Sequence, residues 1–383
     1  MSTYRTLNQT VLAKVETTQG EDAAPTTTDD AVLVENPSRN PNLGIVETNE
    51  VTGALDDRGP LPAGGFSPFT CDVWLKGSGT GGVPPEFAPF LLGCAMAETI
   101  LTPALTGTAT AGASNTITVV SATGVAVGMI IRTTGGTGPG QTRVITAINS
   151  LILTVFPAWT VTPDATTTYS IDAQVLYAPT STNLDTVTIY RYRHRSDGGD
   201  SKLDTVLGAA GSWTLNIPVR NPGRLSFNYQ GQLSAPTDVT PPSAAVYDSV
   251  RPFPYLNALT YLGSSAIKLN TLSLDFGGQV QLIDNPAQAF GYDAAGVTRR
   301  RISGRFNPPT ELQSVRDAFS GWLNQTSQQF WVAYGSTAGN RVSIYLPEVR
   351  YSGVEEEDVN GFAHEGLPFR ALGQNTGLYL SLY

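Results

Sequence analysis

The stretch GSWTLNIPVRNPGRLSFNYQGQL, residues 211–233, decides the fold class of this chain. In both of its halves apolar residues alternate with polar ones: Trp213, Leu215, Ile217 and Val219 first, then Leu225, Phe227 and Tyr229. A strand points successive side chains to opposite faces of its sheet, so a period of two predicts a half-buried β-strand. We therefore expect two consecutive strands here, each with one face in a core.

Similar strand patterns recur along the chain. They cover residues 70–75, 186–195, 266–276, 329–334, 341–346 and 377–383. Within 266–276 the apolar phase slips between Leu269 and Leu272, which predicts a β-bulge. The 39 glycines and 26 prolines supply the turns that many short strands require. The predicted fold class is all-β.

Only two helices are predicted, over residues 85–97 and 310–323, and each is expected to cover one face of a sheet. Pro85 suits a first helical turn, and Thr310 with Gln313 fits a capping box. Their apolar stripes are Phe87, Phe90, Leu91 and Cys94 in the first helix, and Leu312, Val315, Phe319, Trp322 and Leu323 in the second.

The composition limits the function classes. Only 14% of the 383 residues are charged, against roughly 25% in ordinary globular domains. The surface is therefore built largely from Thr, Ser, Asn, Gln and Gly, which is typical of β-proteins that are partly buried in assemblies. The net charge of −9 argues against a protein that grips nucleic acid, because affinity for phosphates comes from clustered Lys and Arg.

The cysteines and the apolar runs of the sequence indicate in which cell compartment the protein is made. Cys71 and Cys94 cannot supply a disulfide framework for a chain of this size, and two free buried thiols are favoured over a bridge. The first twenty residues contain no apolar signal-peptide core, and the longest apolar run, 87–97, is too short to span a bilayer. We expect a protein made in the cytoplasm.

Changes in composition divide the chain into segments. Residues 1–40 are polar and acidic and predict an extended arm, and residues 36–68 predict a long loop that becomes ordered against a partner. Residues 101–173 carry only four charged residues and predict a small inserted β domain whose junctions lie close together. Residues 41–100 and 174–383 then form the host β domain.

The inserted segment has its own strand patterns. They cover residues 116–120, 129–132, 142–147, 151–155 and 168–171. The glycine-rich stretch at 135–142 lies between two of them. It lacks the lysine and the following helix of a phosphate-binding loop, so a turn is the better interpretation.

No catalytic, cofactor-binding or metal-binding residue is predicted. His194 and His364 lie on different strand-like segments without a recognisable nucleophile motif. The acidic run at 355–358 lacks the ligand spacing of a calcium loop and reads as a solvated loop. Asp56 and Asp57 read as surface charge, which weakens a glycosidase interpretation.

One basic cluster stands out. Arg299, Arg300 and Arg301, with Arg305, could contact phosphate. The acidic total favours a salt-bridge patch between subunits instead.

Five segments in their order resemble the major tail tube proteins of long-tailed, non-contractile bacteriophages. They are KVETTQGEDAAPTTTDDAVLVENP (14–37), TCDVWLKGSGTGG (70–82), PPEFAPFLLGCAMAET (84–99), the strand-rich stretch 175–233 and KLNTLSLDFGGQV (268–280). The resemblance runs over residues 14–100 and 174–383. The segment MIIRTTGGTGPGQTRVI looks like β-insertions that decorate phage structural proteins.

The resemblance implies a tail-tube β-sandwich or barrel whose copies form hexameric rings that stack into a tube around DNA. The expected partners are copies of the chain and the tail terminator, tape measure and tail-tip proteins. DNA would pass through the lumen without specific binding, and the insert would project outward. The implied location is the virion, after assembly in the host cytoplasm.

Two other function classes stay open. The chain could be a tail-tip adhesin or capsid decoration protein whose inserted β domain binds a glycan. A carbohydrate-active enzyme is a third possibility, against which the lack of paired catalytic carboxylates counts.

Overall fold

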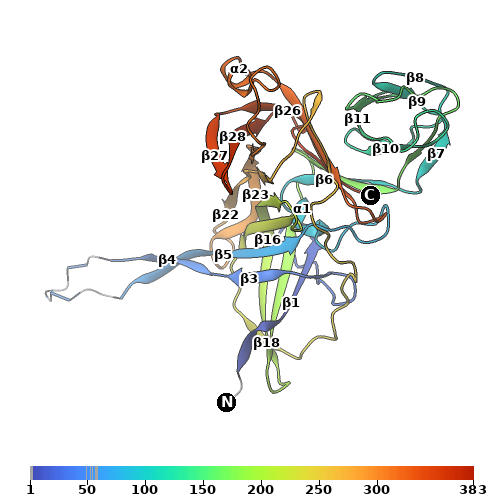
Figure 1. Cartoon of the computed structure of the whole chain (residues 1–383). Coiled ribbons are helices and arrows are strands. Elements are labelled where there is room, and N and C mark those ends of the chain that lie inside the picture. Colours follow the sequence, from blue (N-terminus) through green and yellow to red (C-terminus); the bar gives the residue numbers. More distant parts are fainter. Residues whose placement is uncertain (1–2, 49, 52, 54, 57–58) are drawn as a thin grey trace.

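The computed structural model describes residues 3–48, 50–51, 53, 55–56 and 59–383, and the chain is all-β with several sheets (Figure 1). The described residues form one sheet of 20 strands, one of seven and one of two. The helices are α1 (Ala88–Leu92) and α2 (Ala318–Leu323). Neither helix of the described segments has the length and apolarity needed to span a membrane.

The 20-stranded main sheet gathers strands from both ends of the chain. They are β1 (Tyr4–Val15), β2 (Ala31–Val32), β3 (Glu35–Arg39), β4 (Asn42–Val46), β5 (Leu61–Trp74), β6 (Met96–Leu101), β14 (Gln174–Pro179), β15 (Val187–Arg195), β16 (Ser201–Pro218), β17 (Arg224–Gln232), β18 (Thr237–Val239), β19 (Leu259–Leu262), β20 (Ser265–Ala266), β21 (Thr271–Asp275), β24 (Ser303–Phe306), β25 (Gln328–Tyr334), β26 (Val342–Tyr351), β27 (Glu355–Val359), β28 (Phe362–Ala371) and β29 (Tyr379–Leu382). The two-stranded sheet is β22 (Gln279–Asp284) with β23 (Tyr292–Arg299).

The strand pair predicted from residues 211–233 is confirmed as β16 and β17. They are antiparallel, with Trp213 opposite Phe227 and Leu215 opposite Leu225. The inward residues of both strands are buried, and the Trp213 ring stacks on Phe276 at 5.2 Å between centroids. These rings belong to the main hydrophobic core.

β16 extends further toward the N-terminus than the sequence pattern indicated. Its first half pairs with β15 and its second half with β17 and β21. Gly208 lies at the change of partner, with a φ of +57°. A Cβ there would lie 2.8 Å from the Ala294 Cα, so the close approach and the left-handed backbone both require glycine.

The N-terminal arm expected for residues 1–40 is wrong for the described residues 3–40. β1 pairs with β15 over Gln9 to Val15, and Val11, Leu12 and Ala13 are buried. β2 and β3 extend the same sheet, since β2 pairs with β1 and β3 pairs with β5. This segment is therefore part of the folded body, because its short apolar run finds a distant strand to pair with.

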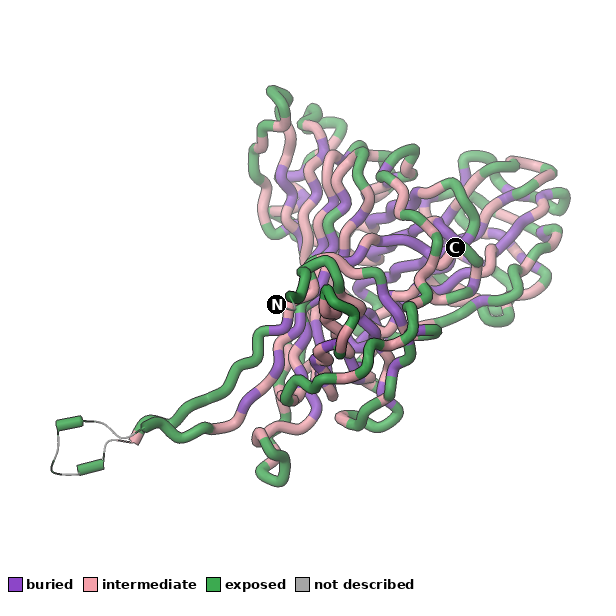
Figure 2. Tube along the Cα trace, turned by 90° about the horizontal axis from the view of Figure 1, so that it is seen from below, coloured by how far each residue is buried: buried purple, intermediate pink, exposed green. Residues whose placement is uncertain are grey.

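The long loop expected for residues 36–68 is instead mostly strand. β4 and β5 pair from Asn42 opposite Phe66 to Val46 opposite Leu61, and they form a hairpin that projects away from the body (Figures 1 and 2). Residues 49, 52, 54 and 57–58 of the expected loop lie outside the described residues.

Both predicted helices are shorter than expected. α1 spans five residues, caps the core with Phe90 and Leu91, and is followed by β6 from Met96 onward. α2 begins after Asp317, whose side chain accepts a hydrogen bond from the Ser320 backbone N–H, so Thr310 is not its cap. The helix does contact β26, and Ala318 belongs to the main core with Trp322 packed against it, but most of the expected apolar stripe is exposed.

Two strand predictions also differ from the structure. The expected strand at 266–276 is divided into β20 and β21, with no strand assigned between them, so the phase slip marks a break instead of a bulge. The acidic run at 355–358 is not a loop: it belongs to β27, which pairs with β28. Its Glu355 and Glu357 carboxylates form ion pairs with Arg305.

Residues 105–171 form the seven-stranded sheet, seen beside the body in Figure 1. Its strands are β7 (Leu105–Thr108), β8 (Ala111–Ala113), β9 (Thr116–Thr118), β10 (Ile130–Gly135), β11 (Thr142–Asn149), β12 (Ile152–Phe156) and β13 (Thr168–Ile171). The chain enters and leaves through β6 and β14, where Leu101 lies opposite Gln174. The two ends of the segment are therefore close together, as expected.

A second hydrophobic core joins the seven-stranded sheet to the main sheet. It combines Ile130, Val144 and Leu153 of the former with Trp331 and Tyr345 of the latter. The two sheets therefore pack against each other.

Candidate assembly surfaces

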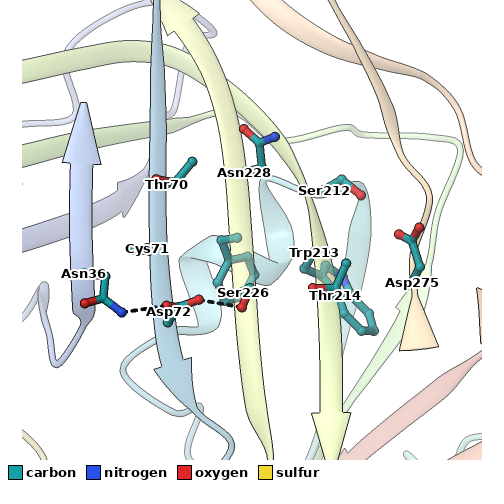
Figure 3. Close-up of a pocket in the computed structure, with 11 residues that line it drawn as sticks. Asn36, Thr70, Cys71, Asp72, Ser212, Trp213, Thr214, Ser226, Asn228 and Asp275 are labelled. Atoms are coloured by element: carbon teal, nitrogen blue, oxygen red, sulfur yellow. Dashed lines mark hydrogen bonds between the residues drawn. The ribbon is translucent and has the colours of Figure 1, made fainter. Parts of the chain in front are cut away.

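The outward face of β5, β17, β16 and β21 carries short polar side chains (Figure 3). The alternation that buries Trp213 and Phe227 turns their neighbours to this opposite face. Cross-strand partners form two rows, Asp72, Ser226, Thr214 and Asp275 in one and Thr70, Asn228 and Ser212 in the other. We call these seven residues the polar sheet face. A shallow cavity of about 450 Å³ lies over it.

Asp72 is the best-held charge on the polar sheet face. Its carboxylate accepts hydrogen bonds from the Ser226 hydroxyl and from Asn36 Nδ2 at 3.1 Å, and Arg224 Nη2 lies 2.6 Å away. Partial burial alone would raise the pKa of Asp72, but these hydrogen bonds and the Arg224 charge outweigh it and lower the pKa. Asp72 is therefore ionised at neutral pH.

The polar sheet face has a net negative charge. Its seven residues include two carboxylates, Asp72 and Asp275, and no cation. Arg224 at the rim is neutralised by Asp72 and by Glu35, which lies 3.1 Å away. Such a surface offers water-exposed hydroxyls and amides but repels phosphate groups.

The β4–β5 hairpin is a second candidate surface. Its apolar side chains lie largely in solvent: Leu43, Ile45, Val46 and Leu61 on the strands, and Val51 and Leu55 beyond them. In sequence, residues 47–58 carry four carboxylates and one arginine. Soluble monomers rarely expose large contiguous apolar surface, so the hairpin has the character of an interaction element.

The structure divides the predicted arginine cluster. Arg305 is held by Glu355 and Glu357 in β27, away from the other three. Arg299, Arg300 and Arg301 line a cavity of about 720 Å³. Arg370 of β28 lines it too, and no local sequence pattern could have shown this, because about 70 residues separate it from Arg299.

A third surface is apolar. Leu312, Val315, Phe319 and Leu323 are each more than half exposed, with Leu312 at 75%. The sequence marked these residues as the inward face of a helix. Residues 312–317 do not form that helix, and only Ala318 and Gly321 of α2 are buried.

The two histidines lie in separate polar environments. His194 contacts the hydroxyls of Thr10 at 3.0 Å and Ser201 at 2.9 Å, and burial lowers its pKa. His364 Nδ1 lies 2.8 Å from the Asn307 carbonyl oxygen. Within the described segments, no three His, Cys, Asp or Glu residues are grouped to hold a metal ion.

Cys71 and Cys94 are free and buried, as the sequence favoured. Burial raises the pKa of Cys94 to about 12, and the Cys94 sulfur lies 3.3 Å from the Tyr229 hydroxyl. The glycine-rich stretch at 135–142 is the turn between β10 and β11, as expected.

The sequence contained a usable signal for the polar sheet face. The alternation in residues 211–233 fixes Ser212, Thr214, Ser226 and Asn228 on the face opposite the core. Asp72 and Asp275 join this face only through strand pairing over long sequence separations. No protein-family model and no curated protein matches this chain.

Proposed function

We propose that this chain is the tail tube subunit of a long-tailed, non-contractile bacteriophage, and that its copies form hexameric rings stacked into a tube. The observation that carries the proposal is the β4–β5 hairpin, which projects from the body with its apolar residues in solvent. Contact with another copy would bury these residues. In this arrangement the hairpin bridges one ring to the next.

The polar sheet face supports a lumen. DNA moves through a tube without adhering when the wall carries hydroxyls, amides and carboxylates and lacks cations. The polar sheet face has this composition. We therefore assign it to the inner wall, with the core behind it.

Open strand edges support a ring. Among the described strands, β4 pairs only with β5 and β6 only with β14. Unpaired edges invite pairing with another chain, and a ring of subunits removes them by closure.

The resemblance to tail tube proteins supplies the outer position of the insert and the partner proteins. The seven-stranded sheet lies on the outside of the tube, because a unit of that size would block the lumen. The tail terminator, tape measure and tail-tip proteins meet the tube at its ends and in its lumen. The chain acts as a non-enzymatic virion component without a cofactor.

Sedimentation velocity at increasing protein concentration tests the proposal. We expect discrete hexamers followed by much larger species, with the free monomer depleted. A chain that stays monomeric up to high concentration contradicts it.

A second candidate function is a tail-tip adhesin or capsid decoration protein that binds a neutral glycan. It is favoured by a cavity of about 600 Å³ between the seven-stranded and main sheets, lined by Asn115, Tyr261 and Gln329 among others. The amides and the aromatic ring are groups that bind sugars. A monomer with measurable affinity for neutral oligosaccharides would support this candidate over the tube.

A further inference from the structure

The arginine-lined cavity has an unbalanced charge. Arg299, Arg300, Arg301 and Arg370 line it, and the remaining lining residues are apolar or neutral, with no carboxylate. We call this cavity the arginine pocket. Four cations gathered without an anion, in a chain of net charge −9, repel one another until a partner neutralises them.

Arg300 holds one wall of the arginine pocket in place. Its guanidinium donates to the backbone carbonyls of Ala95 and Thr180, to the Ser181 hydroxyl and to Asn375 Oδ1, the last at 2.6 Å. It also lies 5.9 Å from the centre of the Phe276 ring. These contacts tie residues 373–377 to the β6–β14 region, so the pocket is built before any ligand enters.

The other three arginines are available for a ligand. Arg299, Arg301 and Arg370 are exposed, and within the described residues they form no ion pair or side-chain hydrogen bond. Elsewhere many arginines are paired, for example Arg305 with Glu357 and Arg316 with Glu365. Guanidinium groups bind carboxylates bidentately, so the pocket fits an acidic group.

The carboxylates of the chain differ in whether they already form ion pairs within it. Glu355 and Glu357 are held by Arg305, Asp197 by Arg195, and Asp30 by Lys14 and the Thr26 backbone. Two carboxylates of the β4–β5 hairpin are different. Glu47 and Asp56 are exposed there and form no ion pair within the described residues.

The hairpin also matches the pocket in its apolar parts. Val51 and Leu55 are fully exposed beside the acidic residues. The arginine pocket adds Ile302 and Leu372 to its arginines. The hairpin projects away from its own body, so it is placed to reach another copy (Figures 1 and 2).

We infer that the arginine pocket of one copy receives the Glu47 and Asp56 carboxylates of the β4–β5 hairpin of a second copy. This inference rests on the proposed self-assembly and adds the surface that the hairpin contacts. Arg299, Arg301 and Arg370 bind the carboxylates, and the apolar residues on both sides exclude water from the contact. The contact is head-to-tail, so it propagates from ring to ring.

Charge reversal in the full-length chain tests the inference. The pocket variant carries Arg301→Glu and Arg370→Glu, and the hairpin variant carries Glu47→Lys and Asp56→Lys. Each changes exposed side chains, so thermal unfolding should match the unaltered protein. The control is Arg251→Glu, which reverses an exposed arginine outside the pocket.

Sedimentation velocity gives the apparent association constant of each variant. We expect each double reversal to lower it at least tenfold and the control to leave it within twofold. An equimolar mixture of the two variants should regain association, because each supplies the charge that the other lacks. Association of the unaltered chain should weaken between 50 mM and 500 mM salt, because the Debye length shortens roughly threefold over this range.

Three outcomes separate the possibilities. If the unaltered chain assembles and neither double reversal weakens it, the inference fails while the proposed function stands. If the unaltered chain stays monomeric, the proposed function fails, and the inference that rests on it fails as well. If the pocket variant assembles normally but loses affinity for a short DNA duplex that the unaltered chain binds, the pocket is a phosphate site and the inference is overturned.

Discussion

The buried Glu16 carboxylate accepts a hydrogen bond from the Gly208 backbone N–H at 2.7 Å. It also accepts from the hydroxyls of Thr186 and Thr188 and from the Gly20 N–H. Because Glu16 follows β1 and Gly208 lies where β16 changes its pairing partner, this carboxylate joins the end of β1 to the centre of the main sheet.

Replacing Glu16 should be costly. Glu16→Ala leaves four donors without their acceptor, and we expect a loss of about 3 kcal/mol in the free energy of unfolding. Glu21→Ala, an exposed carboxylate five residues on, should change it by less than about 0.5 kcal/mol. Urea denaturation measures both, and equal stability of the two variants would refute the role given to Glu16.

Two phenylalanines should behave oppositely. Phe227 is buried in the main core, whereas Phe319 is 56% exposed on α2. We expect Phe227→Ala to cost about 4 kcal/mol and Phe319→Ala less than about 1 kcal/mol. Chemical denaturation gives both values. A cost at Phe319 close to that at Phe227 would mean that the apolar stripe is packed in the monomer.

Sequence reasoning worked where the information is local and failed where it is not. The alternation of apolar and polar residues at 211–233 was enough to predict the paired strands seen in β16 and β17. β1 pairs with β15, a strand about 180 residues away, and the sequence of β1 alone does not indicate which strand it pairs with. The capping pattern at Thr310 is sound locally, yet no sheet lies beneath Leu312, so packing did not extend the helix there.

The same distinction applies to the candidate surfaces. The polar residues of β16 and β17 follow from alternation, while Asp72 and Asp275 reach them only through pairing with β5 and β21. Arg370 joins Arg299 in the arginine pocket for the same reason.

Both thiols should resist modification in the native protein. Burial raises the pKa of Cys71 and Cys94, so hardly any thiolate exists at pH 8. With Ellman's reagent we expect no reaction in buffer within minutes and two thiols per chain in 6 M guanidinium. No reactive thiol in denaturant would reveal a bridge between the two cysteines.

Asp72 should stabilise the fold except at very low pH. Its pKa is lowered in the folded chain, so its contribution is complete above the unfolded value of about 3.9 and is lost as pH falls through the lower folded value. Asp72→Asn should therefore be less stable than the unaltered chain at pH 7. The difference should shrink as the pH falls below about 3.9, and a difference that stays constant as the pH is lowered would contradict the assignment.

Cryo-electron microscopy of material assembled from the purified chain tests the central claim most directly. We predict stacked six-fold rings in which the polar sheet face, with Asp72 and Asp275, lines the lumen and the seven-stranded sheet lies outside. Single particles without rings, or rings whose lumen is lined by another surface, would contradict the account.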